Sequence, residues 1–120
     1  MGKYAEFTAY RQKLNKKILE QGNLEIKRFF ALDGQVYQPG ALTAKTKELL
    51  GLAASMVLRC DDCISYHVIQ AKEAGASRAE IFETFGIALI VGGSIVIPHL
   101  RRAVDFLEEL ENRGLGEEKT

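Results

Sequence analysis

Nowhere in this chain do apolar and polar residues alternate with a period of two for long enough to predict a β-strand. Apolar residues instead follow the helical spacing that places them on one face of an α-helix. Only two prolines, Pro39 and Pro98, interrupt the 120 residues, and there is no repeat and no low-complexity linker. The sequence therefore predicts an all-α protein, a single domain of about six helices over residues 1–120 with its core at about 20–112.

Capping residues, glycines and turn signals divide the chain into helical segments. The predicted helices are residues 3–21; a segment capped by Asn23 that breaks at Asp33-Gly34; one capped by Thr43 that runs to about Arg59; one from Cys60 to Gly75; one opened by the capping box of Ser77 and Glu80; and one after Gly92-Gly93.

The third of these helices is apolar almost all round. From Leu49 to Leu58 its only polar side chain is Ser55. A helix that is apolar on every face is expected to be buried on every face. In so small a domain we expect a second subunit to help cover this helix, together with the apolar stretch from Phe85 to Leu100.

Composition excludes several classes of partner. The chain has 16 Lys and Arg residues and 16 Asp and Glu residues, so no basic surplus favours nucleic acid. The longest apolar stretch is too short and too interrupted for a membrane span, which needs about 20 apolar residues. The first ten residues do not resemble a secretory signal. We therefore expect a cytoplasmic protein without a nucleic-acid or membrane partner.

The two cysteines, Cys60 and Cys63, are better suited to chemistry than to stabilising the fold. A disulfide over so short a loop restricts the unfolded chain little. At the start of a helix, free N–H groups and the helix dipole favour a thiolate. Asp61 and Asp62, which we expect to cap this helix, work against a second negative charge.

His67 follows Cys63 by four residues, which places both side chains on one helix face, one turn apart. A histidine there can accept the thiol proton. Tyr66 is adjacent but is expected to point elsewhere. Glu48 lies twelve residues before Cys60, about 18 Å along a straight helix. It can approach His67 only through an angled crossing of the two helices or from a neighbouring subunit.

Glu48, Cys60, Cys63 and His67 match a known signature: a glutamate, eleven intervening residues, CxxC, three residues and a histidine. On this basis the chain resembles the alkylhydroperoxidase D-like / carboxymuconolactone decarboxylase family over roughly residues 40–105. A lone CxxC is a weak signal, whereas the four residues at these spacings in an all-helical chain are a strong one. The further residues that carry the resemblance are Thr43, Thr46, Lys47, Leu52, Ala53, Arg59, Ala71, Ala74 and Gly75.

The resemblance implies an all-α fold that assembles into homotrimers or homohexamers. It also implies thiol-dependent reduction of hydroperoxides, with the disulfide then reduced by a dithiol partner protein and with no cofactor or metal. Cys63 is the expected nucleophile, Cys60 closes the disulfide, His67 is the base and Glu48 orients it, although the opposite cysteine order stays open. One departure is Asp62, which stands where the peroxidase of this family has a relay histidine.

Other interpretations remain open. Cys60, Cys63 and His67 form a zinc site if His99 or a carboxylate supplies the fourth ligand, although His99 is more simply structural. The family also contains decarboxylase-like enzymes that act on a lactone or a small organic acid without a redox CxxC. A third alternative is a non-catalytic redox sensor whose disulfide controls oligomer packing. For Glu48, the simplest alternative to a site role is an ion pair with Lys45 or Lys47 on the helix surface. Lys72, Arg101 and Arg102 are most simply charges exposed to solvent.

Overall fold

The computed structural model describes residues 2–114, and within that range it contains helices and no strand. The all-α prediction is therefore confirmed. The helices are α1 (Lys3–Gln21), α2 (Leu24–Val36), α3 (Ala44–Val57), α4 (Asp61–Glu73), α5 (Arg78–Gly92), the short 3-10 helix η1 (Ser94–Val96) and α6 (Ile97–Asn112).

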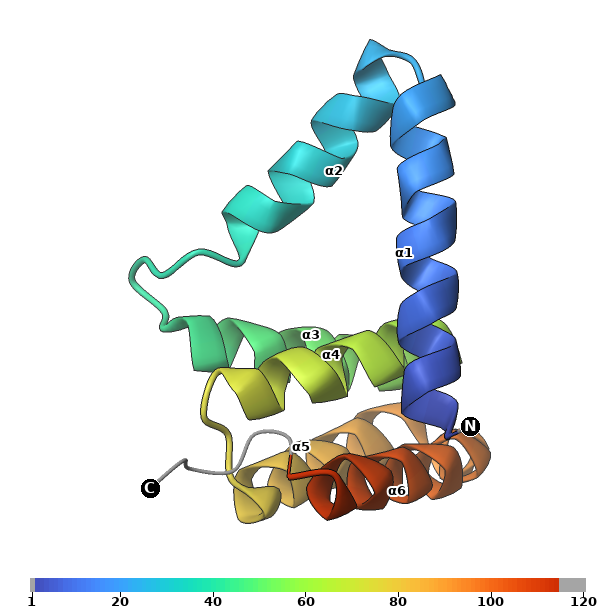
Figure 1. The fold of residues 1–120 in the computed structure, drawn as a ribbon. Coiled ribbons are helices and arrows are strands. Elements are labelled where there is room, and N and C mark those ends of the chain that lie inside the picture. The colour runs from blue at the N-terminus through green and yellow to red at the C-terminus, as the bar shows by residue number, and fades with distance from the viewer. Residues whose placement is uncertain (1, 115–120) are drawn as a thin grey trace.

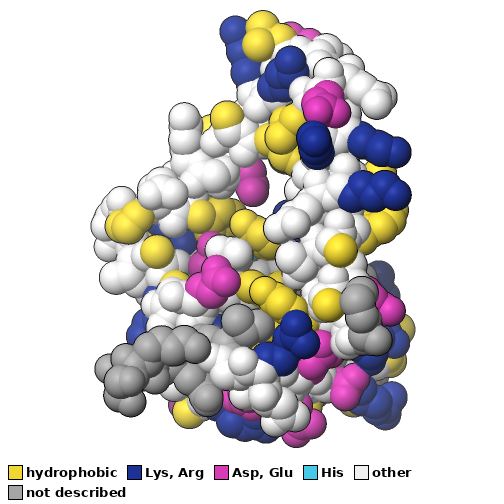
Figure 2. Space-filling model, viewed as in Figure 1, with side chains coloured by type: hydrophobic (Ala, Val, Ile, Leu, Met, Phe, Trp, Pro, Cys, Tyr) yellow, Lys and Arg dark blue, Asp and Glu magenta, His cyan; other side chains and the backbone are white. Residues whose placement is uncertain are grey.

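Four helices form a two-layer body, and the first two form an arm above it (Figure 1). The hairpin of α3 and α4 lies on α5 and α6, with α3 packed against α5 and α4 against α6. Helix α1 stands upright along one side, and α2 leans back from its upper end toward the start of α3. The space-filling view has a hollow between these two helices, with hydrophobic and acidic side chains along it (Figure 2).

The core lies entirely between α3 and α6, because neither α1 nor α2 has a buried residue. Its largest fully buried side chains come from each of the four helices and from η1, which explains why these elements pack as one body. They are Leu52, Met56, Ile64, Val68, Ile81, Phe85, Val96, Leu107 and Leu110.

Helix α1 joins this body at its first turns. The carboxylate of Glu109 on α6 accepts the backbone N–H groups of Lys3 and Tyr4, at 3.0 and 2.9 Å. These are unpaired donors of the first helical turn, so an acidic partner stabilises them. The Phe7 ring meets Phe106 edge-on, with 6.0 Å between ring centroids. The start of α1 is thus attached to α6.

Most predicted helix starts are confirmed. The side chains of Asn23 and Thr43 accept N–H groups in the first turns of α2 and α3. Ser77 and Glu80 form the complete capping box of α5. The predicted break at Asp33-Gly34 is wrong, since α2 continues to Val36. A glycine inside a helix lowers its stability by only about 1 kcal/mol relative to alanine. This is too little to end a helix whose C-terminus is held by hydrogen bonds from another residue.

That residue is Lys47 of α3. Its Nζ donates to the backbone oxygens of Val36 and Gln38, at 2.8 and 2.6 Å. A cation at the C-terminus of a helix satisfies its last carbonyl groups and interacts favourably with the helix dipole. Lys47 therefore sets the end of α2 and holds the backbone on both sides of Tyr37.

The turn from α3 to α4 sets the position of the cysteines. Helix α3 ends at Val57 rather than at Arg59, because Arg59 adopts a left-handed conformation with φ of 60°. The N–H of Arg59 bonds to Met56 O and that of Cys60 to Ser55 O, both at 3.0 Å. This pair of bonds is a Schellman motif, which reverses the chain within three residues. It brings Cys60 to the start of α4.

Helix α3 is not buried on every face within the single chain. Its side toward the core is buried, but Leu50 is 55% and Leu58 is 75% exposed. Exposed apolar side chains continue across the neighbouring helix α5 at Ile87 and Ile90. None of the helices in residues 2–114 is both long and apolar enough to cross a membrane.

Candidate active site

Glu48 and His67 meet where α3 and α4 lie side by side. The Nδ1 atom of His67 is 2.9 Å from Oε1 of Glu48, and both residues are buried. The hairpin of α3 and α4 closes this contact within one chain, so no neighbouring subunit is needed for it. A buried carboxylate is stable when it is paired and hydrogen-bonded. The surface pairing of Glu48 with Lys45 or Lys47 is therefore wrong: Lys45 bonds to Glu80 and Lys47 to the end of α2.

The two cysteines are free thiols at the start of α4, with their Sγ atoms 2.6 Å apart. Cys60 is itself the N-cap residue, and its Sγ accepts the backbone N–H of Cys63 at 3.3 Å. The expectation that Asp61 and Asp62 cap this helix is thus wrong. Cys63 lies in the first turn and is exposed, whereas Cys60 is half-buried.

Asp61 binds residues of α6 instead. Its two oxygens lie 2.8 Å from Nδ1 of His99 and 3.0 Å from Nε of Arg102. His99 therefore has the structural role expected of it, and Arg102 is paired rather than simply solvated. Lys72 is also not a solvated charge, because it is buried beside Glu111 at 4.0 Å. These pairs attach α4 to α6 at both ends of α4.

The surroundings of Cys63 disfavour a thiolate in the resting protein. Although Cys63 is exposed as a residue, partial desolvation of its thiol, the hydrogen bond with Cys60, and the negative charges of Cys60 and Asp62 together raise the pKa of Cys63 to about 11. At neutral pH this thiol is protonated. Its chemistry as a nucleophile therefore needs a base that removes the proton during the reaction.

His67 is placed to be that base. Its Nδ1–H can donate to Glu48, which leaves the lone pair of Nε2 available to accept a proton. Cys63 and His67 line the same cavity, of about 170 Å³, together with Arg11, Asp62, Tyr66 and Asp33. The site residues predicted from the spacing are thus brought together: Cys60 contacts Cys63, Cys63 shares a cavity with His67, and His67 bonds to Glu48.

Two aromatic residues around His67 were not predicted. The Tyr37 hydroxyl lies 3.5 Å from Nε2 of His67, with 5.3 Å between the ring centroids. Tyr66 meets the same imidazole edge-on at 5.2 Å, so the expectation that it points elsewhere is wrong. Tyr37 follows the end of α2, and nothing in its sequence context indicates that α2 returns to α4.

Gly51 is a further site residue that sequence reasoning missed. A Cβ atom at this position would lie 2.7 Å from Cε1 of His67 and 2.7 Å from the Tyr37 hydroxyl. Only a residue without a side chain allows both groups to pack against the backbone of α3. The available signal was an isolated glycine inside an apolar helix, three residues after Glu48.

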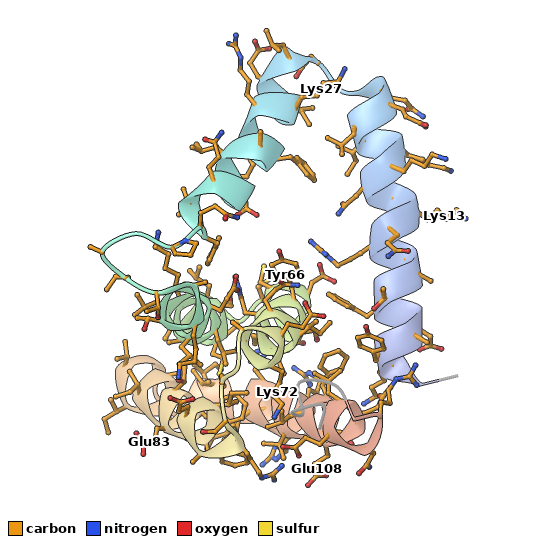
Figure 3. All side chains as sticks on the ribbon, turned by 60° about the vertical axis from the view of Figure 1, so that its left-hand side comes forward. Lys13, Lys27, Tyr66, Lys72, Glu83 and Glu108 are labelled. Carbon is orange, nitrogen blue, oxygen red and sulfur yellow. The ribbon has the colours of Figure 1, made fainter. Side chains whose placement is uncertain are left out.

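Tyr66 connects the thiol cavity with two larger ones. It lines the 170 Å³ cavity and the neighbouring cavities of about 350 and 250 Å³. In Figure 3 its side chain points into the space between α1, α2 and α4. The guanidinium of Arg11 on α1 lies over the Tyr66 ring, 4.2 Å from its centroid. The arm of α1 and α2 therefore forms one wall of the approach to Cys63.

The zinc interpretation is not supported within residues 2–114, where no group of three or more metal-ligating side chains is arranged to hold an ion. Two of the residues proposed as ligands have other partners. His67 bonds to Glu48, and His99 bonds to Asp61.

The chain is similar to a known protein family over most of its length. The model of the carboxymuconolactone decarboxylase family matches residues 24–106, a segment that includes Glu48, Cys60, Cys63 and His67. Among curated proteins, an uncharacterized protein from the cox locus of Paracoccus denitrificans is 32% identical over 83 residues. These are 69% of this chain and 75% of that protein.

Solved structures share the fold over nearly the whole chain. Two crystal structures of one protein from Thermotoga maritima are 61% and 60% identical to this chain, with TM-scores of 0.89 and 0.85. Each alignment covers 91% of this chain; it covers 96% of the solved chain in the first structure and 95% in the second. That protein is described as a carboxymuconolactone decarboxylase family member for which a role in antioxidative response has been suggested. A family member from Legionella pneumophila is 30% identical, with a TM-score of 0.77, over 92% of this chain and 96% of that one.

Proposed function

This chain belongs to the carboxymuconolactone decarboxylase family, and we propose that it is an alkylhydroperoxidase-like enzyme that reduces hydroperoxides through Cys60 and Cys63. The observation that carries the proposal is the connected set of Glu48, His67 and Cys63, with a second thiol 2.6 Å away. A base that shares a cavity with one thiol, and a second thiol in contact with the first, are what a dithiol peroxidase needs. The antioxidative role suggested for the Thermotoga maritima relative supports the same chemistry.

In the first step, His67 accepts the proton of Cys63, and Glu48 stabilises the imidazolium that forms. The Cys63 sulfur attacks the terminal peroxide oxygen, and the O–O bond breaks with its electron pair on the leaving oxygen. That oxygen takes up a proton, so the products are an alcohol and a sulfenic acid on Cys63. Cys63 is favoured as the nucleophile because it, and not Cys60, lines the cavity with His67.

In the second step, the Cys60 sulfur attacks the Cys63 sulfur, a disulfide forms, and the hydroxyl group leaves as water. One hydroperoxide and two thiols thus give one alcohol, one water and one disulfide. A dithiol reductant or a redox partner protein returns the two electrons by thiol–disulfide exchange. We further propose that the active protein is a homotrimer or homohexamer.

The proposal is tested by counting thiols before and after one equivalent of cumene hydroperoxide, with mass spectrometry to locate the oxidation. Wild type is expected to lose both thiols, and Cys60→Ser to gain one oxygen on Cys63. Cys63→Ser is expected to keep its remaining thiol under the same treatment. If Cys60 is oxidised in that variant while Cys63 survives in Cys60→Ser, the cysteine order is reversed.

The same experiment separates the alternatives. Thiols that survive the hydroperoxide in wild type would sink the peroxidase proposal. Conversion of a lactone or small organic acid that persists when both cysteines are replaced by serine would favour the decarboxylase-like enzyme. A disulfide that changes the mass of the assembly without turnover would favour the redox-sensing oligomer.

A further inference from the structure

The hydroxyl group of Tyr37 has no part in the scheme above, yet several contacts hold it at the reacting centre. It lies 3.5 Å from Nε2 of His67, the nitrogen that must accept the Cys63 proton. The two rings stack with a tilt of 39°. Gly51 leaves room for both, since a Cβ there would meet the phenol oxygen at 2.7 Å and Nε2 at 2.9 Å. The hydroxyl is therefore packed against the edge of the imidazole that carries the lone pair.

The backbone around Tyr37 is held from α3. Lys47 Nζ binds the carbonyl oxygens of Val36 and Gln38, the residues on either side of Tyr37 in the chain. Lys47 is next to Glu48 in α3. One turn of this helix therefore supplies Glu48 to Nδ1 of His67 and, through Lys47, positions Tyr37 at Nε2. This arrangement brings a residue of the α2–α3 loop to the site by two hydrogen bonds rather than by burial in the core.

Tyr37 remains a proton donor in this environment. Burial raises the pKa of its phenol, and the charges of Glu48, Asp33 and Cys63 raise it further. Tyr37 lines the cavity of about 350 Å³, which adjoins the thiol cavity at Tyr66. From there its protonated phenol can donate either to Nε2 of His67 or to an oxygen of a substrate that extends between the two cavities.

Reduction of an alkyl hydroperoxide needs such a donor. Cleavage of the O–O bond leaves an alkoxide, which is a poor leaving group unless it is protonated as it departs. His67 takes the Cys63 proton at Nε2, the nitrogen that the Tyr37 hydroxyl contacts. A second donor beside His67 would protonate the leaving oxygen while His67 holds the thiol proton.

On the basis of the proposed peroxidase function, we propose that Tyr37 is the general acid that protonates the leaving alkoxide. When the hydroperoxide binds, the Tyr37 O–H turns from Nε2 to the oxygen that carries the alkyl group. His67 Nε2, now free, takes the proton of Cys63, whose sulfur forms a bond to the terminal oxygen. The O–O electron pair goes to the alkoxide, which takes the phenol proton, and the phenolate recovers a proton from His67. Cys63–SH and ROOH thus give Cys63–SOH and ROH.

The test compares two oxidants that differ in leaving group. Reduced wild type, Tyr37→Phe and Tyr10→Phe are mixed with tert-butyl hydroperoxide or with peracetic acid, and the first-turnover rate of Cys63 oxidation is measured by rapid quench and mass spectrometry. Peracetic acid expels acetate, which needs no acid catalyst. Loss of a general acid should slow the reaction with the alkyl hydroperoxide by about 10²-fold or more and leave the reaction with peracetic acid within about threefold of wild type.

The matched control is Tyr10, which is 67% exposed on α1 and also becomes phenylalanine. Equal slowing with both oxidants in Tyr37→Phe would mean that Tyr37 acts only by packing, and would overturn this inference while the peroxidase function stands. Unchanged rates with both oxidants would overturn it as well. If wild type reacts with neither oxidant, the proposed function and this inference fail together.

Discussion

At the scale of single residues, the charge beside Cys63 opposes the thiolate that peroxide chemistry requires. Asp62 stands immediately before Cys63, where the resembling peroxidase has a relay histidine. Its charge adds to the effects of partial desolvation and of Cys60, which together raise the pKa of Cys63 to about 11. The proposed peroxidase reaction would therefore depend on proton removal by His67, rather than on a thiolate that is present beforehand.

Asp62→Asn is expected to lower the pKa of Cys63, because one of the negative charges that raise it is removed. The thiolate fraction below that pKa then increases. We expect about two- to threefold faster alkylation of Cys63 by iodoacetamide at pH 8, which corresponds to a few tenths of a pKa unit. Mass spectrometry assigns the label to Cys63. Asp62→Glu keeps the charge and serves as the control, and a rate in Asp62→Asn that equals this control would contradict the expectation.

At the scale of elements, α3 forms the floor of the site as well as the centre of the core. Glu48 and Gly51 lie on adjacent turns of this helix, and Leu52 and Met56 are fully buried below them. The imidazole of His67 thus packs directly against the backbone of α3 at Gly51. Any side chain at residue 51 would push His67 and Tyr37 away from α3.

Gly51→Ala tests this packing against Gly86→Ala, a change at a helical glycine where an added Cβ would meet no atom within 4 Å. The first change should destabilise the protein by about 1–3 kcal/mol, the cost of overpacking. The second should stabilise it by about 0.5–1 kcal/mol, because alanine is the better helix former. Urea unfolding measures both. If Gly51→Ala stabilises the protein as much as Gly86→Ala does, then His67 and Tyr37 do not pack closely on α3.

At the scale of the whole molecule, a large apolar face is left open in the single chain. It spans α3 and α5 and includes Leu50, Leu58, Ile87, Ile90 and Val91, which are 55–84% exposed. A shallow cavity of about 420 Å³ lies on this face, lined only by alanine, valine, leucine and isoleucine side chains. Contiguous apolar surface of this kind is typical of a subunit interface, and it is the side of α3 that the sequence predicts to be covered.

Ile90→Glu is expected to break the assembly. Ile90 is 84% exposed in the single chain, so the change should leave the fold of one subunit intact while placing a charge in the proposed interface. Burying that charge without a partner would cost several kcal/mol. Light scattering should give a trimer or hexamer for wild type and a smaller species for the variant. Lys13→Glu introduces a negative charge at an exposed position on α1, away from the α3–α5 face, and should behave as wild type does. A monomeric wild type would contradict the prediction.

The sequence by itself determined the features that depend on neighbours within one turn of chain. The capping residues Asn23, Thr43 and Ser77 were readable because each bonds to an N–H group three residues away. The relation of Cys63 to His67 was readable for the same reason, since both lie on α4. The pairing of Glu48 with His67 was identified through the family signature, although helix geometry alone left open which chain supplied the contact.

Only the tertiary structure decided what depends on segments far apart in the sequence. Lys47 sets the end of α2 from eleven residues away, which is why the break predicted at Gly34 is wrong. Tyr37 reaches His67 across thirty residues, and Gly51 matters only because both of them pack against it. Such contacts follow from how α2, α3 and α4 cross in space. Local periodicity carries no information about that crossing, because helical spacing specifies which face of a helix is apolar but not which helix will cover it.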